Sequence, residues 1–253
     1  MTDIYPLLPS KREKALAWSV HFFTATGAMW GLLGLIAIMQ QQWKAVFLWF
    51  IVASFVDGVD GLLARRFKVK GVLPDFDGAL LDNILDYLTY VILPALFLYN
   101  MEGLLPRGWE LFAAGLVAMT STYQFCQSDA KTDDHTFKGF PSYWNVVAFY
   151  LFTMGANPWV NLAILVVLGI LVFVPVKYAY PSRMVRYQQP TVALAVVWSL
   201  MVLAILFLMP SQPLWLVYAS LFFPIYYVGI SLFMMWEDKQ KQKPVRLGRV
   251  AGD

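Results

Sequence analysis

Four aspartates lie near the ends of two long apolar runs, where a membrane helix tolerates charge poorly. Asp57 and Asp60 come late in one run, and Asp82 and Asp86 come early in the next. A carboxylate at a helix centre costs about 2.5 to 3.5 kcal/mol on insertion scales, so four uncompensated carboxylates would cost about 10 kcal/mol. Clustered carboxylates repel one another, and their hard oxygens suit Mg²⁺ or Mn²⁺. The sequence therefore predicts that a divalent metal binds here.

Small and basic residues share helix faces with these aspartates. At about 100° per residue, one stripe holds Asp57, Asp60, Gly61, Ala64 and Arg65, and a second holds Gly78, Asp82 and Asp86. Gly71 and Pro74 lie between the stripes and would turn the chain, so that the two stripes face each other. Small side chains beside the carboxylates would leave room for a flat ligand or a pyrophosphate.

A structural alternative is that the four acids form buried ion pairs with the basic residues that follow them, Arg65, Arg66, Lys68 and Lys70. Charge counting allows this interpretation. Ion pairing would not require two glycines and an alanine on the same stripes, however, and ionisable residues inside membranes usually serve function. The pattern favours a ligand site.

The elements that must position these residues are membrane helices. Of 253 residues, 59% are hydrophobic and 14% are charged, whereas soluble domains carry about a quarter charged residues. Runs long enough to cross about 30 Å of hydrocarbon lie near 16–40, 43–64, 79–100, 108–128, 191–209 and 213–236. Asn157-Pro158 would divide 141–178 into spans near 141–156 and 158–178. We predict an all-α membrane protein with about eight transmembrane helices.

A single polytopic domain is expected over residues 16–236, with a different segment at each end. Residues 1–15 form a flanking segment, and Ile4 to Trp18 have the composition of a short amphipathic helix on the membrane surface. Residues 237–253 are polar and basic, and we expect a cytoplasmic tail without regular structure. The single cysteine, Cys126, excludes an intramolecular disulfide and is expected to be buried.

Basic residues predict the orientation of the helices. With the N-terminus inside, the inner segments carry Lys11, Arg12, Lys14, Arg65, Arg66, Lys68, Lys70, Lys131, Lys138, Lys177, Arg183, Arg186, Lys239, Lys241, Lys243, Arg246 and Arg249. The outer loops hold little beyond Lys44 and Arg107. By the positive-inside rule, both termini and all four aspartates are cytoplasmic. The net charge is only +3, and aromatic residues are not interleaved with the basic ones, so nucleic acid is not an expected partner.

The eight residues of the two stripes match a known signature, D-x2-D-G-x2-A-R followed by a spacer and G-x3-D-x3-D. Every specified position is present: Asp57, Asp60, Gly61, Ala64, Arg65, Gly78, Asp82 and Asp86. The chain thus resembles the CDP-alcohol phosphotransferase family. It departs from that family in its spacer, residues 66–77, which is longer than in most members.

The long spacer, the segment DYLTYVILPALFLY after the motif and GFPSYWNVVAFYLF at 139–152 resemble the bacterial phosphatidylcholine synthase branch. This resemblance implies transfer of a phosphatidyl group from CDP-diacylglycerol to choline, which yields phosphatidylcholine and CMP. It also implies two bound Mn²⁺ or Mg²⁺ ions, a multi-pass protein of the bacterial inner membrane with a cytoplasmic active site, and a homodimer, as in many family members.

The resemblance also assigns roles to the motif residues. Asp57, Asp60 and Asp82 would hold the two metals on the pyrophosphate, with Asp86 as a further ligand or neighbour. Asp86 is also the expected catalytic base, which takes the proton of the acceptor hydroxyl. The nucleotide would lie near Gly61, Ala64, Arg65 and Gly78, together with Thr24 on the first helix.

The acceptor site is less clearly marked. Choline is a quaternary ammonium without an N–H group, so its site is expected to use aromatic faces. Candidates near the cytoplasmic ends are Tyr87, Tyr90, Tyr123, Tyr143, Trp144 and Tyr180, with Tyr178 nearby. Arg183 and Arg186 are candidate contacts for the lipid phosphate. They would equally suit glycerol phosphate or inositol phosphate, and both acceptors, as well as serine, remain alternatives.

Two other classes of function remain open. A divalent-cation transporter would use the aspartates for translocation, although it would need polar groups deeper in the membrane. A membrane scaffold would use Gly27, Gly31 and Gly34 for helix contacts within or between chains. His21 and His135 are isolated in the sequence and are expected to be structural, and the polar loop 129–138 is expected to be solvated.

Overall fold

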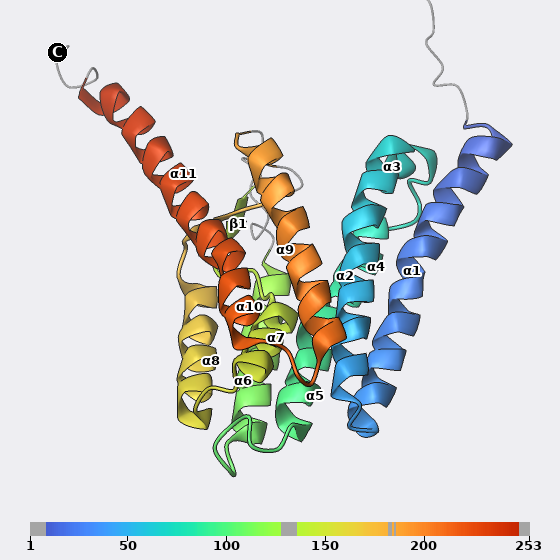
Figure 1. Cartoon of the computed structure of the whole chain (residues 1–253). Helices are drawn as coiled ribbons and strands as arrows, with labels where there is room; N and C mark the ends of the chain where they lie inside the picture. Colours follow the sequence, from blue (N-terminus) through green and yellow to red (C-terminus); the bar gives the residue numbers. More distant parts are fainter. Residues whose placement is uncertain (1–8, 128–135, 182–183, 185, 248–253) are drawn as a thin grey trace, which may run out of the picture.

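The computed structural model describes residues 9–127, 136–181, 184 and 186–247, which form a bundle of helices (Figure 1). In chain order the helices are α1 (Lys11–Met39), α2 (Trp43–Arg66), α3 (Val69–Val72), α4 (Gly78–Asp86), α5 (Leu93–Asn100), α6 (Glu110–Cys126), α7 (Trp144–Met154), α8 (Pro158–Phe173), α9 (Gln188–Leu208), α10 (Leu214–Ser220) and α11 (Phe222–Leu247). A π-helical segment, η1 (Tyr87–Ile92), joins α4 to α5 without a break.

Every predicted apolar run contains a helix, which confirms an all-α membrane protein. Five helices are long and apolar enough to span a membrane: residues 11–39, 43–66, 78–100, 188–208 and 214–240. By contrast, α6, α7 and α8 have 17, 11 and 16 residues. Length and composition therefore support five membrane spans among the described residues. The predicted total of eight spans also counted α6, α7 and α8.

A pair of short strands was not predicted. Strand β1 (Thr136–Lys138) pairs antiparallel with β2 (Lys177–Ala179), with Phe137 opposite Tyr178. Helix α8 ends at Phe173, so the predicted span 158–178 was too long; the chain becomes extended at Val174, just before Pro175. Gly139 closes the pair against α8 with φ of +81°, where an added Cβ would lie 2.2 Å from the Val172 carbonyl oxygen. Only glycine fits that position.

The described residues at the two ends of the predicted domain are helical. A capping box between Ser10 and Glu13 starts α1, so residues 11–18 are its first turns, while residues 1–8 of the predicted N-terminal segment lie outside the described residues. At the other end, α11 continues to Leu247, so the described part of the predicted unstructured tail is helical. Cys126 is exposed because it ends α6, whereas burial was expected.

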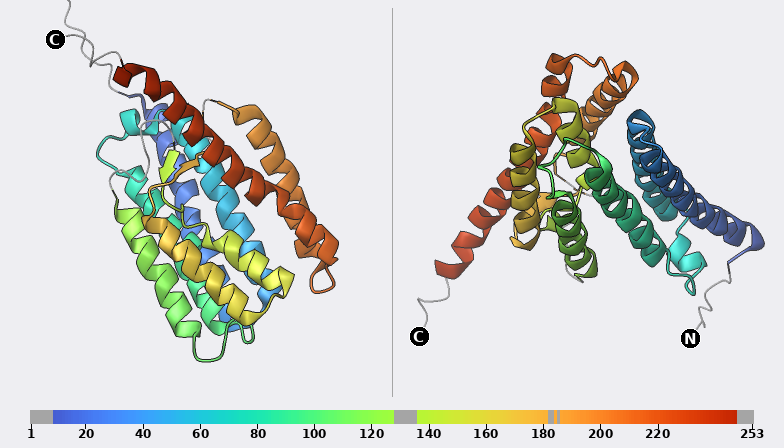
Figure 2. Two further views of the ribbon diagram at one scale, coloured as in Figure 1. Left: turned by 90° about the vertical axis from the view of Figure 1, so that its left-hand side faces the viewer. Right: turned by 90° about the horizontal axis from the view of Figure 1, so that it is seen from below.

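Glycines on α1 allow close packing against the continuous helix of residues 78–100. An added Cβ on Gly31 would lie 2.7 Å from Leu88, and those on Gly27 and Gly34 would meet Leu85 and Leu93 at 3.3 and 3.1 Å. The glycine stripe therefore serves contacts within the chain. Seen from below, α1 and α2 lie on one side of the 78–100 helix and α6 and α8 lie on the other (Figure 2).

One end of the bundle gathers the elements that carry the candidate site. The C-terminal end of α2, α3, the start of α4 and strand β1 all lie there, together with the start of α1 and of α9 (Figure 1). We call this the β1 end. The loops that contain Gln41 and Arg107 lie at the opposite end.

Candidate active site

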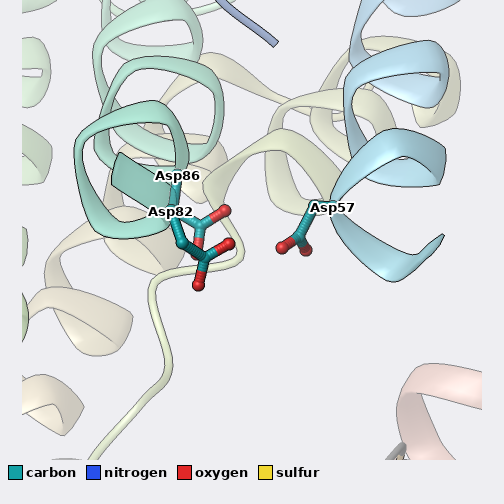
Figure 3. A group of neighbouring side chains, drawn as sticks. All are labelled: Asp57, Asp82 and Asp86. Atoms are coloured by element: carbon teal, nitrogen blue, oxygen red, sulfur yellow. The ribbon is translucent and has the colours of Figure 1, made fainter. Parts of the chain in front are cut away.

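Three of the four aspartates point toward one another at the β1 end. Asp57 extends from α2 toward Asp82 and Asp86, which lie one turn apart on the same face of α4 (Figure 3). Each residue offers a carboxylate oxygen, and these oxygens all lie within 4.8 Å of one another. This hard-oxygen donor set fits a divalent cation such as Mg²⁺ or Mn²⁺.

The local fold explains how α2 and α4 come to face each other. Helix α2 ends at Arg66, and Lys68 then adopts a left-handed conformation with φ of 50° before the short helix α3. Asp77 caps the next helix, because its Oδ1 accepts hydrogen bonds from the backbone N–H groups of Ala79 and Leu80. The spacer thus reverses the chain and starts α4 beside the end of α2.

Asp60 occupies a different position from the other three aspartates. Among the described residues it is not part of the three-carboxylate group, and only 5% of it is exposed. It lines an adjacent cavity with Thr24 of α1 and with Asp82. Asp60 lies three residues after Asp57 on the same broad face of α2, rotated by about 60°, and borders the cavity beside α1.

This adjacent cavity has a volume of about 710 Å³, within the range of about 300 to 1,000 Å³ that is typical of ligand sites. It lies between α1, α2, the α3 segment and α4. All the residues predicted to bind the nucleotide line it: Thr24, Gly61, Ala64, Arg65 and Gly78. Lys68 and Lys70 add positive charge to its wall, which suits a phosphorylated ligand.

The two motif glycines leave space for specific side chains. An added Cβ on Gly61 would lie 3.3 Å from Nη1 of Arg65, and one on Gly78 would lie 2.5 Å from Cε1 of His21. The second contact is too short for any residue other than glycine unless the imidazole moves. Gly78 is therefore required by the neighbouring histidine as well as by the cavity.

His21 lines the cavity, although its isolation in the sequence suggested a purely structural role. It is 7% exposed, and its ring packs against Phe76 at a centroid distance of 4.4 Å. Within the described part of the chain, no hydrogen-bond partner reaches Nε2. No local pattern could have identified this residue, because its contact with Gly78 joins two different helices.

Tyr90 contacts the carboxylate group directly. Its hydroxyl donates a hydrogen bond of 2.7 Å to Oδ2 of Asp57. Tyr90 lies in η1, the π-helical segment that begins immediately after Asp86, and such wider turns occur often at functional sites. This turn keeps Tyr90 close to the helix face that carries Asp82 and Asp86.

Tyr90 also belongs to a group of aromatic rings that are in contact with one another. Tyr143 lies 6.3 Å from Tyr90 and 6.1 Å from Tyr227, measured between ring centroids. Tyr227 stacks on Tyr178 at 6.1 Å, while Phe137 lies 6.5 Å from Tyr143 and 4.5 Å from Tyr180. We call this group the tyrosine cluster: Tyr90, Tyr143, Tyr178, Tyr180 and Tyr227, with Phe137.

The tyrosine cluster includes three of the six predicted choline contacts, Tyr90, Tyr143 and Tyr180. The other three face elsewhere. The Tyr87 hydroxyl bonds to Ala118 and Thr122 on α6; buried Trp144 donates to Ser121 at 2.7 Å; and Tyr123, 45% exposed, packs against Phe173. Trp144 directly follows Tyr143 of the cluster, and a rotation of about 100° per residue along a helix directs the two side chains to different neighbours.

Tyr227 was not identified from the sequence. It lies in the apolar segment FFPIYYVGISLF, which has no motif and reads as an ordinary membrane helix. Only the packing of α11 against β2 brings its ring to Tyr143 and Tyr178.

Arg186, a predicted contact for the lipid phosphate, has carboxylate partners in this structure. Its guanidinium forms ion pairs with Glu237 at 2.6 Å and with Asp238, both on α11. The hydrogen bond to Asp238 raises the pKa of Arg186 above its ordinary value. These two carboxylates already neutralise the guanidinium charge. Arg183, the other predicted phosphate contact, lies outside the described residues.

Comparison with known proteins agrees with this geometry. The model of the CDP-alcohol phosphatidyltransferase family matches residues 20–176, which include all four aspartates. Similar curated proteins are named phosphatidylcholine synthase. That of Legionella pneumophila is 48% identical over 168 residues, covering 66% of each chain. That of Pseudomonas aeruginosa is 43% identical over 186 residues, covering 74% of this chain and 78% of the relative. That of Mesorhizobium japonicum is 40% identical over 201 residues, covering 78% and 74%.

Proposed function

Because this chain belongs to the CDP-alcohol phosphatidyltransferase family, we propose that it transfers the phosphatidyl group of CDP-diacylglycerol to choline and releases CMP. The observation that carries the proposal is the position of the three carboxylates between the 710 Å³ cavity and the tyrosine cluster. A nucleotide site and an aromatic site thus flank one acidic centre. The relatives named phosphatidylcholine synthase support choline as the acceptor.

The acidic residues fit a two-metal site. Asp57, Asp82 and Asp86 would hold Mn²⁺ or Mg²⁺, and Asp60 would complete the ligand set from the side of the cavity. When bound, two divalent ions neutralise the pyrophosphate and stabilise the CMP leaving group. The Tyr90 hydroxyl orients Asp57 through its hydrogen bond.

Asp86 acts as the general base. It accepts the proton of the choline hydroxyl as the oxygen attacks the β-phosphorus of CDP-diacylglycerol. A bond forms between the choline oxygen and the β-phosphorus, and the bond from that phosphorus to the bridging oxygen breaks. CMP leaves with the bridging oxygen, while Arg65, Lys68 and Lys70 provide positive charge along the cavity that holds the nucleotide.

The acyl chains have a suitable site on the other side of α2. An apolar cavity of about 480 Å³ lies between α2, α7 and α9, with Phe50, Gly58, Phe149 and Trp198 among its lining residues. Gly58 follows Asp57 directly in the sequence, so this cavity lies next to the acidic centre. Burial of lipid chains against these side chains would stabilise the bound donor by about 0.8 kcal/mol per methylene group.

We place the protein in the bacterial inner membrane with eight spans, cytoplasmic termini and the β1 end in the cytoplasm. The basic residues of the β1 end, including Arg65, Arg66 and Lys177, support this orientation by the positive-inside rule, since Lys44 lies at the opposite end. A homodimer is expected from the family resemblance, and cross-linking in native-like bilayers would test it.

Purified protein supplied with CDP-diacylglycerol, Mn²⁺ and labelled choline should form phosphatidylcholine and CMP in equal amounts. Chelation with EDTA should stop the reaction, and added Mn²⁺ or Mg²⁺ should restore it. Serine, glycerol 3-phosphate and inositol phosphate should give little CMP, and preferential transfer to one of them would replace choline as the acceptor. Nucleotide-independent metal uptake into proteoliposomes would favour the transporter alternative.

A further inference from the structure

The C-terminal helix α11 lies beyond the part of the chain that matches the family model, yet it packs against β2 and brings Tyr227 to Tyr143 of the tyrosine cluster. The Tyr227 hydroxyl donates to the carbonyl oxygen of Ala179 at 3.0 Å, and the Ala179 N–H donates to Oγ of Ser231 at 2.9 Å. Two hydrogen bonds to one strand residue therefore hold one face of α11, and with it the ring of Tyr227, in a defined position.

The tyrosine cluster lies within reach of the reacting groups. The Tyr90 hydroxyl donates a hydrogen bond to Asp57, and the Tyr143 ring lies 6.3 Å from the Tyr90 ring, measured between centroids. In choline, two carbon atoms separate the hydroxyl from the nitrogen. A choline hydroxyl at Asp86 therefore requires the ammonium group to lie next to that residue.

A quaternary ammonium has no N–H, so only aromatic faces and negative charge can bind it. Cation–π attraction acts within about 6 Å of a ring centroid. Tyr90, Tyr143, Tyr180 and Tyr227 each keep part of their surface exposed, while Tyr178 is buried and its ring stacks on that of Tyr227.

We propose that Tyr227 of α11 joins Tyr90, Tyr143 and Tyr180 in an aromatic site for the quaternary ammonium group of the acceptor. The identity of that acceptor as choline rests on the proposed function. Helix α11 thus contributes to acceptor specificity, although it lies outside the residues that match the family model, and Tyr178 acts as a positioning residue behind Tyr227.

Two substitutions of Tyr227 distinguish the contribution of its ring from that of its hydroxyl. Tyr227→Leu removes the ring and should raise the KM for choline about tenfold, within the range of cation–π energies. It should also reduce the preference for choline over ethanolamine, measured as the ratio of kcat/KM. Tyr227→Phe keeps the ring, loses the bond to Ala179 and should retain that preference. The KM for CDP-diacylglycerol should stay unchanged in both variants.

The matched control is Tyr226→Leu. Tyr226 is the adjacent tyrosine on α11, but its hydroxyl bonds to Thr191 on α9 and its ring contacts Phe223. This variant should keep the wild-type preference for choline. An unchanged choline KM in Tyr227→Leu would overturn the proposal. So would an equal loss of activity with choline and ethanolamine, because that result indicates a purely structural role.

Equilibrium dialysis with labelled choline distinguishes this inference from the proposed function. Wild-type protein should bind choline in the presence of Mn²⁺ and CMP, and Tyr227→Leu should bind it about tenfold more weakly. Suppose that choline binding weakens in Tyr227→Leu but choline never causes release of CMP. That result would support the ammonium site and refute the transferase activity. Turnover of choline with equal binding by both proteins would refute the ammonium site alone.

Discussion

The residues of the aspartate motif divide into two sets. Asp57, Asp82 and Asp86 converge across the gap between α2 and α4, whereas Asp60 faces the nucleotide cavity beside Thr24. Asp57 and Asp60 share one broad face of α2, but their side-chain directions differ by about 60°, so Asp57 can face α4 while Asp60 borders the cavity next to α1. The two sets suit different oxygen atoms of one pyrophosphate.

Loss of the proposed base should abolish turnover. Asp86→Asn keeps the size of the side chain and removes its capacity to accept a proton, so kcat should fall by about a hundredfold to ten-thousandfold. The KM for CDP-diacylglycerol should change less. Asp75→Asn, at an exposed position in the spacer, is the control and should keep wild-type activity. Near-wild-type turnover by Asp86→Asn would refute the role as base.

Because Gly78 and His21 are in contact, substitutions at these two positions should have non-additive effects on the KM for CDP-diacylglycerol. In Gly78→Ala the new Cβ would lie 2.5 Å from the imidazole, and such overpacking costs about 1 to 3 kcal/mol. We expect the KM for CDP-diacylglycerol to rise about tenfold. Adding His21→Ala should relieve the clash, so the double variant should be less impaired than the sum of the two single variants.

Gly115→Ala is the control for that pair, since no atom lies within 4 Å of its added Cβ. It should leave the KM for CDP-diacylglycerol unchanged. Strict additivity of Gly78→Ala and His21→Ala would show that the two positions do not interact in the enzyme.

At the scale of elements, three connections position the site. The spacer reverses the chain between α2 and α4, η1 continues α4 so that Tyr90 reaches Asp57, and the β1–β2 pair joins α7, α8 and α11 to the same end of the bundle. Hydropathy predicted the helices well because apolar runs are continuous in the sequence. It overlooked the strands because three residues are too few to establish an alternating pattern.

The apolar cavity between α2, α7 and α9 predicts a size-dependent effect at Gly58. Gly58→Ala should be close to wild type, since its added Cβ meets no atom within 4 Å. Gly58→Trp should fill part of the cavity and exclude several methylene groups, each worth about 0.8 kcal/mol, so the KM for CDP-diacylglycerol should rise about tenfold or more. The KM for choline should not change. Equal kinetics for both variants would exclude acyl chains from this cavity.

At the scale of the whole molecule, the described residues of the candidate site gather at one end of the helix bundle. The carboxylates, the 710 Å³ cavity and the tyrosine cluster lie at the β1 end, and Arg65, Lys68 and Lys70 line that cavity. This one-sided arrangement suits an enzyme that meets a membrane lipid and a soluble substrate at one surface. A transporter would need access to its site from both surfaces.

The single cysteine provides a direct test of the orientation. Cys126 is exposed at the end of α6, so a membrane-impermeant maleimide should label it in opened membranes and not in intact spheroplasts. Replacing it with serine and introducing Arg107→Cys at the opposite end should reverse that result. Labelling of Cys126 in intact spheroplasts would place the β1 end outside the cytoplasm.

The sequence by itself determined the membrane class, the helical runs and the two acidic stripes, because each depends on residues within one run or one helical turn. It also indicated the residues that line the nucleotide cavity, since their spacing matches a known signature. Only the tertiary structure separated Asp60 from the other aspartates, brought His21 against Gly78, and distinguished Tyr90 and Tyr143 from Tyr87 and Trp144. The structure also added Tyr227 to the tyrosine cluster. All these contacts join elements that are distant in the sequence, and they depend on packing that no local pattern encodes.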